Sequence, residues 1–263
     1  MGWWSSVVDA VSSRFGGQSP EPVPPGQLST VEDLLARMRA LQSALPEGDG
    51  VRAFNGMYLT VTELVRDRLV AGGFSDTAFM TRLDLVFAGL YLEAVQSGSP
   101  VAAWRPLLER RDAPGVLPIQ FALAGMNAHI NHDLPIAVVR ACRQLGIDLG
   151  SPAVEADYQA VTDLLASVQE QVRRSFISGV ELEVDRAYAA PVVNLVGTWS
   201  IGRARDAAWA NARVLWELRD VEPLRTDFLD TLSSTVGMVG AQLLTPVAGQ
   251  SGPAAAPPPR ADP

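Results

Sequence analysis

The chain has 263 residues, of which 48% are hydrophobic and 19% charged, with a formal net charge of −8. All 21 basic residues are arginine, because the sequence contains no lysine, and this excludes Schiff-base, P-loop and kinase-type lysine chemistry. The single cysteine, Cys142, excludes an internal disulfide, a Cys-rich zinc site and an iron–sulfur cluster. The acidic balance argues against nucleic acid as a partner, since phosphate neutralisation needs a basic surface.

The two ends of the chain differ from its middle. Residues 1–15 form a short amphipathic segment in which Trp3 and Trp4 either pack on the protein's own surface or dock weakly to a partner or a membrane. Residues 16–28 are a Pro/Gly linker, and the Pro-rich residues 247–263 are expected to be a disordered tail. No signal peptide and no transmembrane run is found, so a cytoplasmic location is expected.

Residues 29–246 carry helical periodicity throughout and predict one all-α, bundle-like domain of about seven to nine helices. The first helix is expected to begin at Ser29 or Thr30, with Ser29 and Glu32 as a capping box. A break is expected at Pro135 and a kink at Pro191. The following helices are expected at about 51–71, 76–97, 100–111, 116–145, 152–178, 180–218 and 222–244.

Both histidines of the chain lie in one short motif, GMNAHINHDLP, at residues 125–135. If this segment is helical, His129, His132 and Asp133 stand at positions i, i+3 and i+4 and share one face. Two imidazoles and a carboxylate suit Zn²⁺, Fe or Mn, and they equally suit acid–base catalysis in which Asp133 orients a histidine. Apolar flanks indicate a buried location, where polar groups need partners.

A structural role is the competing interpretation of this motif. Asp133 before Leu134 and Pro135 is a favourable N-cap for a following helix, with Asn131 and His132 as turn residues that close the preceding one.

Further candidates come from upstream helices. Asp84 lies in the apolar run LDLVFAGLYL, where a carboxylate is costly unless it is paired, so it is a candidate metal ligand, general base or arginine partner. The pattern also predicts a substrate pocket with an apolar wall, to which we assign Asn55, Tyr58, Phe87 and Tyr91.

The segments AHINHDLP, DGVRAFNGMYLTVT and LDLVFAGLYLEAV together resemble the actinobacterial family called domain of unknown function 5995. The resemblance covers roughly residues 30–245, and it implies no established activity. According to this resemblance, the residues that belong to the family's pattern are Asn55, Asp84, His129, His132 and Asp133.

A fainter similarity links His129, Asp133 and Pro135 to the zinc-dependent phospholipase C and single-strand nuclease group, whose helices carry His-x-x-x-Asp followed by Pro. Those enzymes use three zinc ions and more histidines, so this chain could hold at most one or two metals. The leading hypothesis is therefore a metal-dependent enzyme of the hydrolase class that uses His129, His132 and Asp133 as metal ligands and Asp84 to complete the shell.

Two other hypotheses stay open. One is a metal-free helical cyclase or isomerase that acts on an apolar small molecule by proton transfer. The other is a non-catalytic interaction or scaffold protein in which the HINHD segment is a buried hydrogen-bonded junction.

Overall fold

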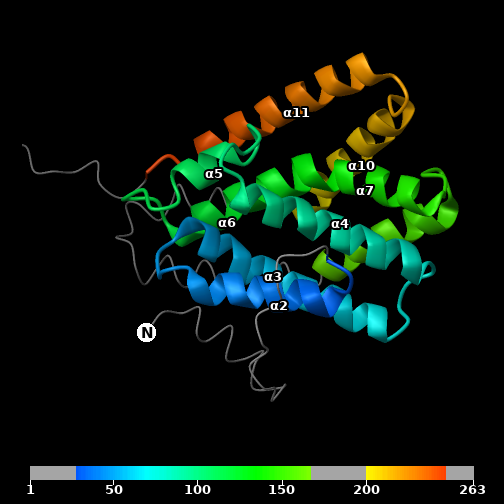
Figure 1. Ribbon diagram of the computed structural model, residues 1–263, viewed down its shortest axis with the longest axis horizontal. Helices are drawn as coiled ribbons and strands as arrows, with labels where there is room; N and C mark the ends of the chain where they lie inside the picture. The colour runs from blue at the N-terminus through cyan, green and yellow to red at the C-terminus, as the bar shows by residue number, and fades with distance from the viewer. Residues whose placement is uncertain (1–27, 167–199, 247–263) are drawn as a thin grey trace, which may run out of the picture.

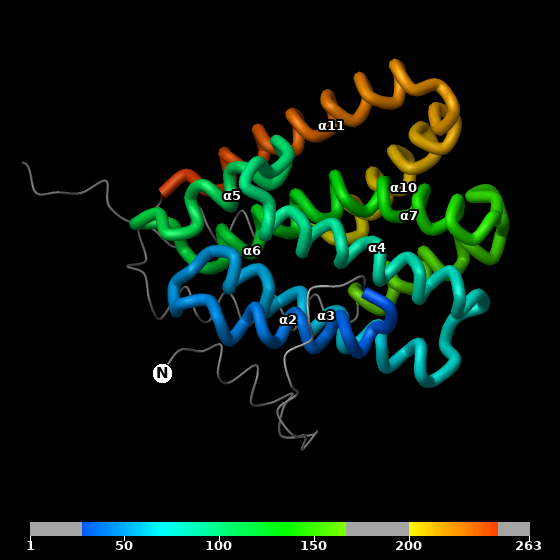
Figure 2. Tube along the Cα trace, viewed as in Figure 1, coloured from blue at the N-terminus to red at the C-terminus, as the bar shows by residue number. Residues whose placement is uncertain are grey.

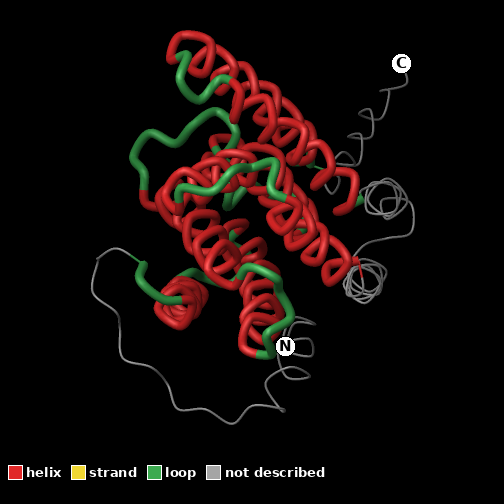
Figure 3. The backbone as a smooth tube through the Cα atoms, turned by 90° about the vertical axis from the view of Figure 1, so that its right-hand side faces the viewer, coloured by secondary structure: helices red, strands yellow, loops and turns green. Residues whose placement is uncertain are grey.

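A computed structural model describes residues 28–166 and 200–246 of the chain. Every regular element in these two ranges is a helix, which confirms the all-α fold class (Figure 3). The expectations that fall outside the described residues concern the segment 1–15, the linker up to residue 27, the tail 247–263, the kink at Pro191, and the parts of the helices expected at 152–178 and 180–218 that lie within 167–199. No helix in the described part of the chain is long and apolar enough to cross a membrane.

The first two helices, α2 (Val31–Ala44) and α3 (Gly50–Val70), lie side by side along one edge of the molecule (Figure 1). The capping box of α2 is formed by Thr30 and Asp33, so the pairing expected for Ser29 and Glu32 is wrong by one residue. Thr30 Oγ1 accepts from the Asp33 amide at 3.0 Å, and Asp33 Oδ2 accepts from the Thr30 amide at 3.1 Å. The Ser29 hydroxyl instead donates a hydrogen bond to Asp33 Oδ2, the same oxygen that accepts from the Thr30 amide.

Helix α4 (Thr77–Gln96) runs through the middle of the bundle, between α2, α3 and α7 (Figure 2). The Asp76 side chain caps it by accepting a hydrogen bond from the amide of Phe79. A distant carboxylate supports the same terminus, because Asp157 accepts hydrogen bonds from the amides of Ser75 and Asp76 at 2.7 and 2.6 Å. The next helix, α5 (Arg105–Glu109), is shorter than the helix expected at 100–111.

Residues 118–145 form one continuous rod made of three parts: α6 (Pro118–Ala128), the π-helical turn η1 (His129–Asp133) and α7 (Leu134–Leu145). The expected interruption at Pro135 is therefore wrong. Proline lacks the N–H that an α-helix would place at this position, and the widened turn before it accommodates that loss. In this turn the amide of Leu134 donates to the carbonyl of His129, five residues back.

The rod then ends at Gly146, whose φ of 67° is the left-handed conformation that glycine tolerates best. Residues 152–166 are also helical, and α10 (Ile201–Glu217) and α11 (Glu222–Leu243) complete the described elements.

The π-helical turn lies at the centre of the bundle, where it packs against α4, α10 and α11 as well as its own neighbours α6 and α7. Close packing of α3 on α6 depends on Gly125, because a Cβ at that position would overlap the Phe54 ring. The fold thus places the one segment that carries both histidines in the middle of the hydrophobic core.

Candidate acid–base site

The π-helical turn buries three polar side chains that contact one another. The Asp133 carboxylate faces both imidazoles: Oδ2 lies 3.0 Å from His129 Nδ1, and Oδ1 lies 2.7 Å from His132 Nδ1. All three residues are at most 6% exposed. Asp133 has helical φ and ψ and makes no side-chain cap, so the predicted alternative of an N-cap is not what the chain adopts.

The hydrogen bonds of Asp133 fix the protonation of His129. Trp104 Nε1, which can only donate, gives its proton to Asp133 Oδ2 at 2.9 Å. Burial raises the pKa of Asp133, but the hydrogen bonds from His129 and His132 outweigh it, so the pKa lies below its ordinary value. An ionised carboxylate only accepts, which means that His129 must carry a proton on Nδ1.

Burial lowers the pKa of His129, and the Asp133 carboxylate only partly opposes that effect. The imidazole is therefore neutral near pH 7, with its proton on Nδ1 and a lone pair on Nε2. This Nε2 atom is buried and has no hydrogen-bond partner among the described residues.

Aromatic rings surround the His129 imidazole. The Phe87 ring stacks on it with centroids 3.5 Å apart and planes 5° from parallel, and the Tyr58 ring meets it edge-on at 4.4 Å. Phe54, Tyr91 and Trp104 lie within 6.0 Å of the same ring. The stacked Phe87 covers one face of the imidazole, whereas the lone pair of Nε2 lies in the plane of the ring.

Two more buried polar atoms are unpaired in the described part of the chain: Asp84 Oδ2 and the Tyr58 hydroxyl. Burial raises the pKa of Asp84 to about 7. Burial, and then the charge of Asp84, raise the pKa of Tyr58 well above its ordinary value, which indicates that the two groups are near each other. Asp84 and Tyr58 line a pocket of about 50 Å³ together with Phe87.

The same pocket also contacts Arg205, which is 3% exposed. Its guanidinium donates to Thr162 Oγ1 and to the carbonyl of Tyr158, and it stacks over the Tyr158 ring at 4.2 Å. No ion pair between Arg205 and a carboxylate is found among residues 28–166 and 200–246. The pocket therefore has a titratable carboxyl on one helix and a buried cation on another.

The sequence profile of a family of unknown function, DUF5995, matches residues 31–246. The chain belongs to this family. The family assignment made from the AHINHDLP motif is thereby confirmed. Nothing among curated proteins or solved structures matches the chain significantly.

In this DUF5995 chain, the metal centre expected from His129, His132 and Asp133 gains no support from the geometry. Both Nδ1 atoms point at the carboxylate and bond to it, so these atoms do not converge on a common ion. No group of three or more His, Cys, Asp or Glu side chains in the described ranges could hold a metal ion. The metal site therefore stays a prediction.

The predicted pocket residues of the DUF5995 chain separate into two groups. Tyr58 and Phe87 line the pocket and contact His129, as expected of a site. Asn55 is hydrogen-bonded on all sides, to Met38, Gln42 and the Tyr91 hydroxyl. Neither Asn55 nor Tyr91 lines this pocket, and their hydrogen bonds tie α2, α3 and α4 together.

Sequence reasoning missed Trp104 and Arg205. Trp104 lies in an apolar segment, and its acceptor Asp133 is distant in the sequence. The one signal available was that a buried indole N–H needs a hydrogen-bond acceptor. Arg205 lies in the Arg-rich sequence IGRARDAA, where nothing distinguishes it from exposed Arg203.

Proposed function

We propose that this chain is an enzyme that moves protons on a small, mostly apolar molecule, as a cyclase or isomerase does, with His129 as the general base. One observation carries the proposal: Nε2 of His129 is a buried, unpaired lone pair on an imidazole whose other nitrogen is held by an ionised carboxylate. A carboxylate that fixes the tautomer and orientation of a histidine is the usual support of a catalytic base.

The neighbouring groups supply the complementary roles. With a pKa of about 7, Asp84 is partly protonated at neutral pH and can give a proton while His129 takes one. The Tyr58 hydroxyl, held neutral by burial, can donate a hydrogen bond to a developing oxyanion. Asp133 orients His129, and Trp104 and His132 bond to the Asp133 carboxylate. His129 itself lies next to the pocket lining, because its ring contacts Tyr58 and Phe87.

The pocket limits what can react. A volume of about 50 Å³ accepts only the reacting end of a molecule, because pockets for whole small ligands are several times larger, roughly 300 Å³ or more. Its walls include Val61, Val65 and Leu134, so the reacting end is apolar apart from the atom that exchanges a proton.

A metal-dependent hydrolase is the second candidate. A histidine that donates Nδ1–H to a carboxylate while Nε2 is free is also the usual arrangement of a metal ligand, and Asp84 lines the adjacent pocket. Both candidates use the same nitrogen, but they differ in their dependence on a divalent ion.

The test uses solvent deuterium. The full chain is incubated in D₂O with a bacterial metabolite extract, and mass spectrometry identifies compounds that gain deuterium or change in abundance. We expect such compounds with the wild-type protein and with the exposed control Arg213→Gln, but not with His129→Gln. Equal turnover by the His129→Gln variant, or no responding compound, contradicts the proposal.

A parallel incubation with a chelator separates the candidates. Activity that persists in the chelator supports proton transfer without a metal, whereas loss that is restored by added Zn²⁺ or Mn²⁺ supports the hydrolase. Circular dichroism of each variant confirms that the fold is retained.

A further inference from the structure

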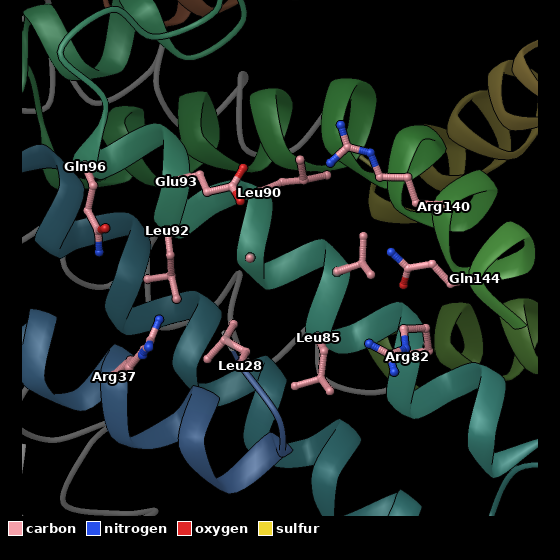
Figure 4. A pocket seen from close by; sticks show the side chains of 12 residues that line it. Leu28, Arg37, Arg82, Leu85, Leu90, Leu92, Glu93, Gln96, Arg140 and Gln144 are labelled. Carbon is pink, nitrogen blue, oxygen red and sulfur yellow. The ribbon is translucent and has the colours of Figure 1, made fainter. Parts of the chain in front are cut away.

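A groove lies along the side of helix α4 that faces away from the acid–base site. Asp84, Phe87 and Tyr91 point inward, whereas Arg82, Val86, Gly89 and Glu93 follow one another at helical spacing about half a turn away. Those outer residues line a groove of about 250 Å³ between α2, α4 and α7 (Figure 4). The body of α4 therefore separates the groove from His129.

The groove combines an apolar floor with a positive rim. Leu28, Val86 and Leu90 contribute to the floor. Arginines approach from three helices, with Arg37 on α2, Arg82 on α4 and Arg140 on α7 (Figure 4).

The charge of this rim contrasts with that of the whole chain. Among the described residues, three arginines and one acidic residue, Glu93, line the groove, whereas the chain as a whole carries −8. Neither Arg82 nor Arg140 forms an ion pair with any residue in the described ranges. Their charges are therefore available to a ligand.

Gly89 keeps the floor of the groove open. It lies inside a long α-helix, where glycine is less favourable than alanine. Within the described ranges no helix contact demands a glycine here, because a Cβ would meet only the Leu28 side chain, at 4.0 Å. The missing side chain thus creates space in the groove without serving the packing of α4.

We propose that this groove binds a small amphipathic anion, a molecule with a short apolar body and one carboxylate, sulfate or phosphate group. The apolar body lies on the floor beside Gly89, and the anionic group lies between Arg82 and Arg140. The volume is slightly below that of ordinary ligand pockets, which suits a short-chain molecule.

The test is an NMR titration of the full chain with octanoate, monitored through backbone amides. We expect saturable shifts confined to the lining parts of α2, α4 and α7. Octan-1-ol, which lacks the charge, and acetate, which lacks the chain, should each bind at least about tenfold more weakly. Octan-1-ol binding as tightly as octanoate overturns the proposal, as does an absence of octanoate shifts in the groove.

Two variants locate the interaction. Removal of two rim charges by Arg82→Gln with Arg140→Gln should weaken octanoate binding about tenfold, and more at low salt. The matched double variant Arg203→Gln with Arg213→Gln removes the same charge from exposed positions on α10 and should leave the affinity within about twofold. Equal effects of the two double variants overturn the proposal.

The variant Gly89→Leu fills the floor and should abolish binding while the circular dichroism spectrum stays unchanged. Unaltered octanoate binding by this variant overturns the proposal. If sedimentation shows instead a wild-type dimer that dissociates in Gly89→Leu, the groove is an interface between two copies, and the small-anion assignment is wrong.

Discussion

The carboxyl of Asp84 should make the stability of this protein fall as the pH rises. Burial raises its folded-state pKa from 3.8 to about 7. Between those values the unfolded chain loses the Asp84 proton and the folded chain keeps it, so the free energy of unfolding decreases by roughly 1.4 kcal/mol per pH unit. Over about three pH units the loss is roughly 4 kcal/mol, and above the folded pKa it becomes constant.

The substitution Asp84→Asn removes the titration and keeps the shape of the side chain. Urea unfolding of both proteins between pH 5.5 and 8.5, above the sequence pI of 4.8, measures the difference in free energy of unfolding. We expect the variant to gain stability relative to wild type up to about pH 7, with no further gain above it.

The slope is the decisive quantity, because the cost of burying the Asn amide does not vary with pH. The exposed Asp230→Asn is the matched control, because it makes the same substitution away from the pocket. A pH-independent difference for Asp84→Asn would refute the idea that burial holds this carboxyl protonated.

Two further predictions concern the atoms around Asp84. Tyr58→Phe should raise the free energy of unfolding by about 1 kcal/mol in urea titrations, because it deletes a buried hydroxyl that has no partner in the described residues; a loss of stability would show that the hydroxyl is bonded. Nitrogen-15 NMR of the imidazoles, assigned with His132→Gln, should find His129 neutral at pH 7 with its proton on Nδ1, and its pKa below the ordinary 6.5. A proton on Nε2 would contradict the role of Asp133 as acceptor.

Much of the fold follows from local signals in the sequence. Helix α4 begins within one residue of its expected start and α7 ends at the expected residue 145, because capping depends on residues within one turn. Helix positions within residues 50–145 were predicted to within a few residues for the same reason, apart from the shortened α5. The burial of the two histidines and the aspartate was also predictable, since their segment is apolar and buried polar groups require partners.

The internal geometry of the site was not predictable from spacing. An α-helix directs residues i and i+1 to different sides, yet His132 and Asp133 contact each other at 2.7 Å. The π-helical turn that allows this contact is a rare conformation, and Pro135 suggested a break more readily than a widened turn. Trp104 and Arg205 come to the site from distant segments, and a single sequence holds no information on such pairings.

The distribution of unpaired atoms favours an active site over a buried structural junction. Buried polar groups with a purely structural role in this protein are bonded, as the amides of Asn55 and Asn127 show. The unpaired buried side-chain atoms of the described residues belong to Tyr58, Asp84 and His129, on three different segments.

Each such atom lowers the free energy of unfolding by about 1–3 kcal/mol. Three of them scattered through the core would therefore destabilise the fold without serving any function. Here the rings of Tyr58 and His129 touch, and Tyr58 and Asp84 share one pocket, so the unsatisfied bonding capacity is concentrated at one place. A bound molecule that accepts from Tyr58 and Asp84 and gives a proton to His129 would satisfy all three at once. A structural junction offers no such compensation, and this difference is the reason to look for a substrate.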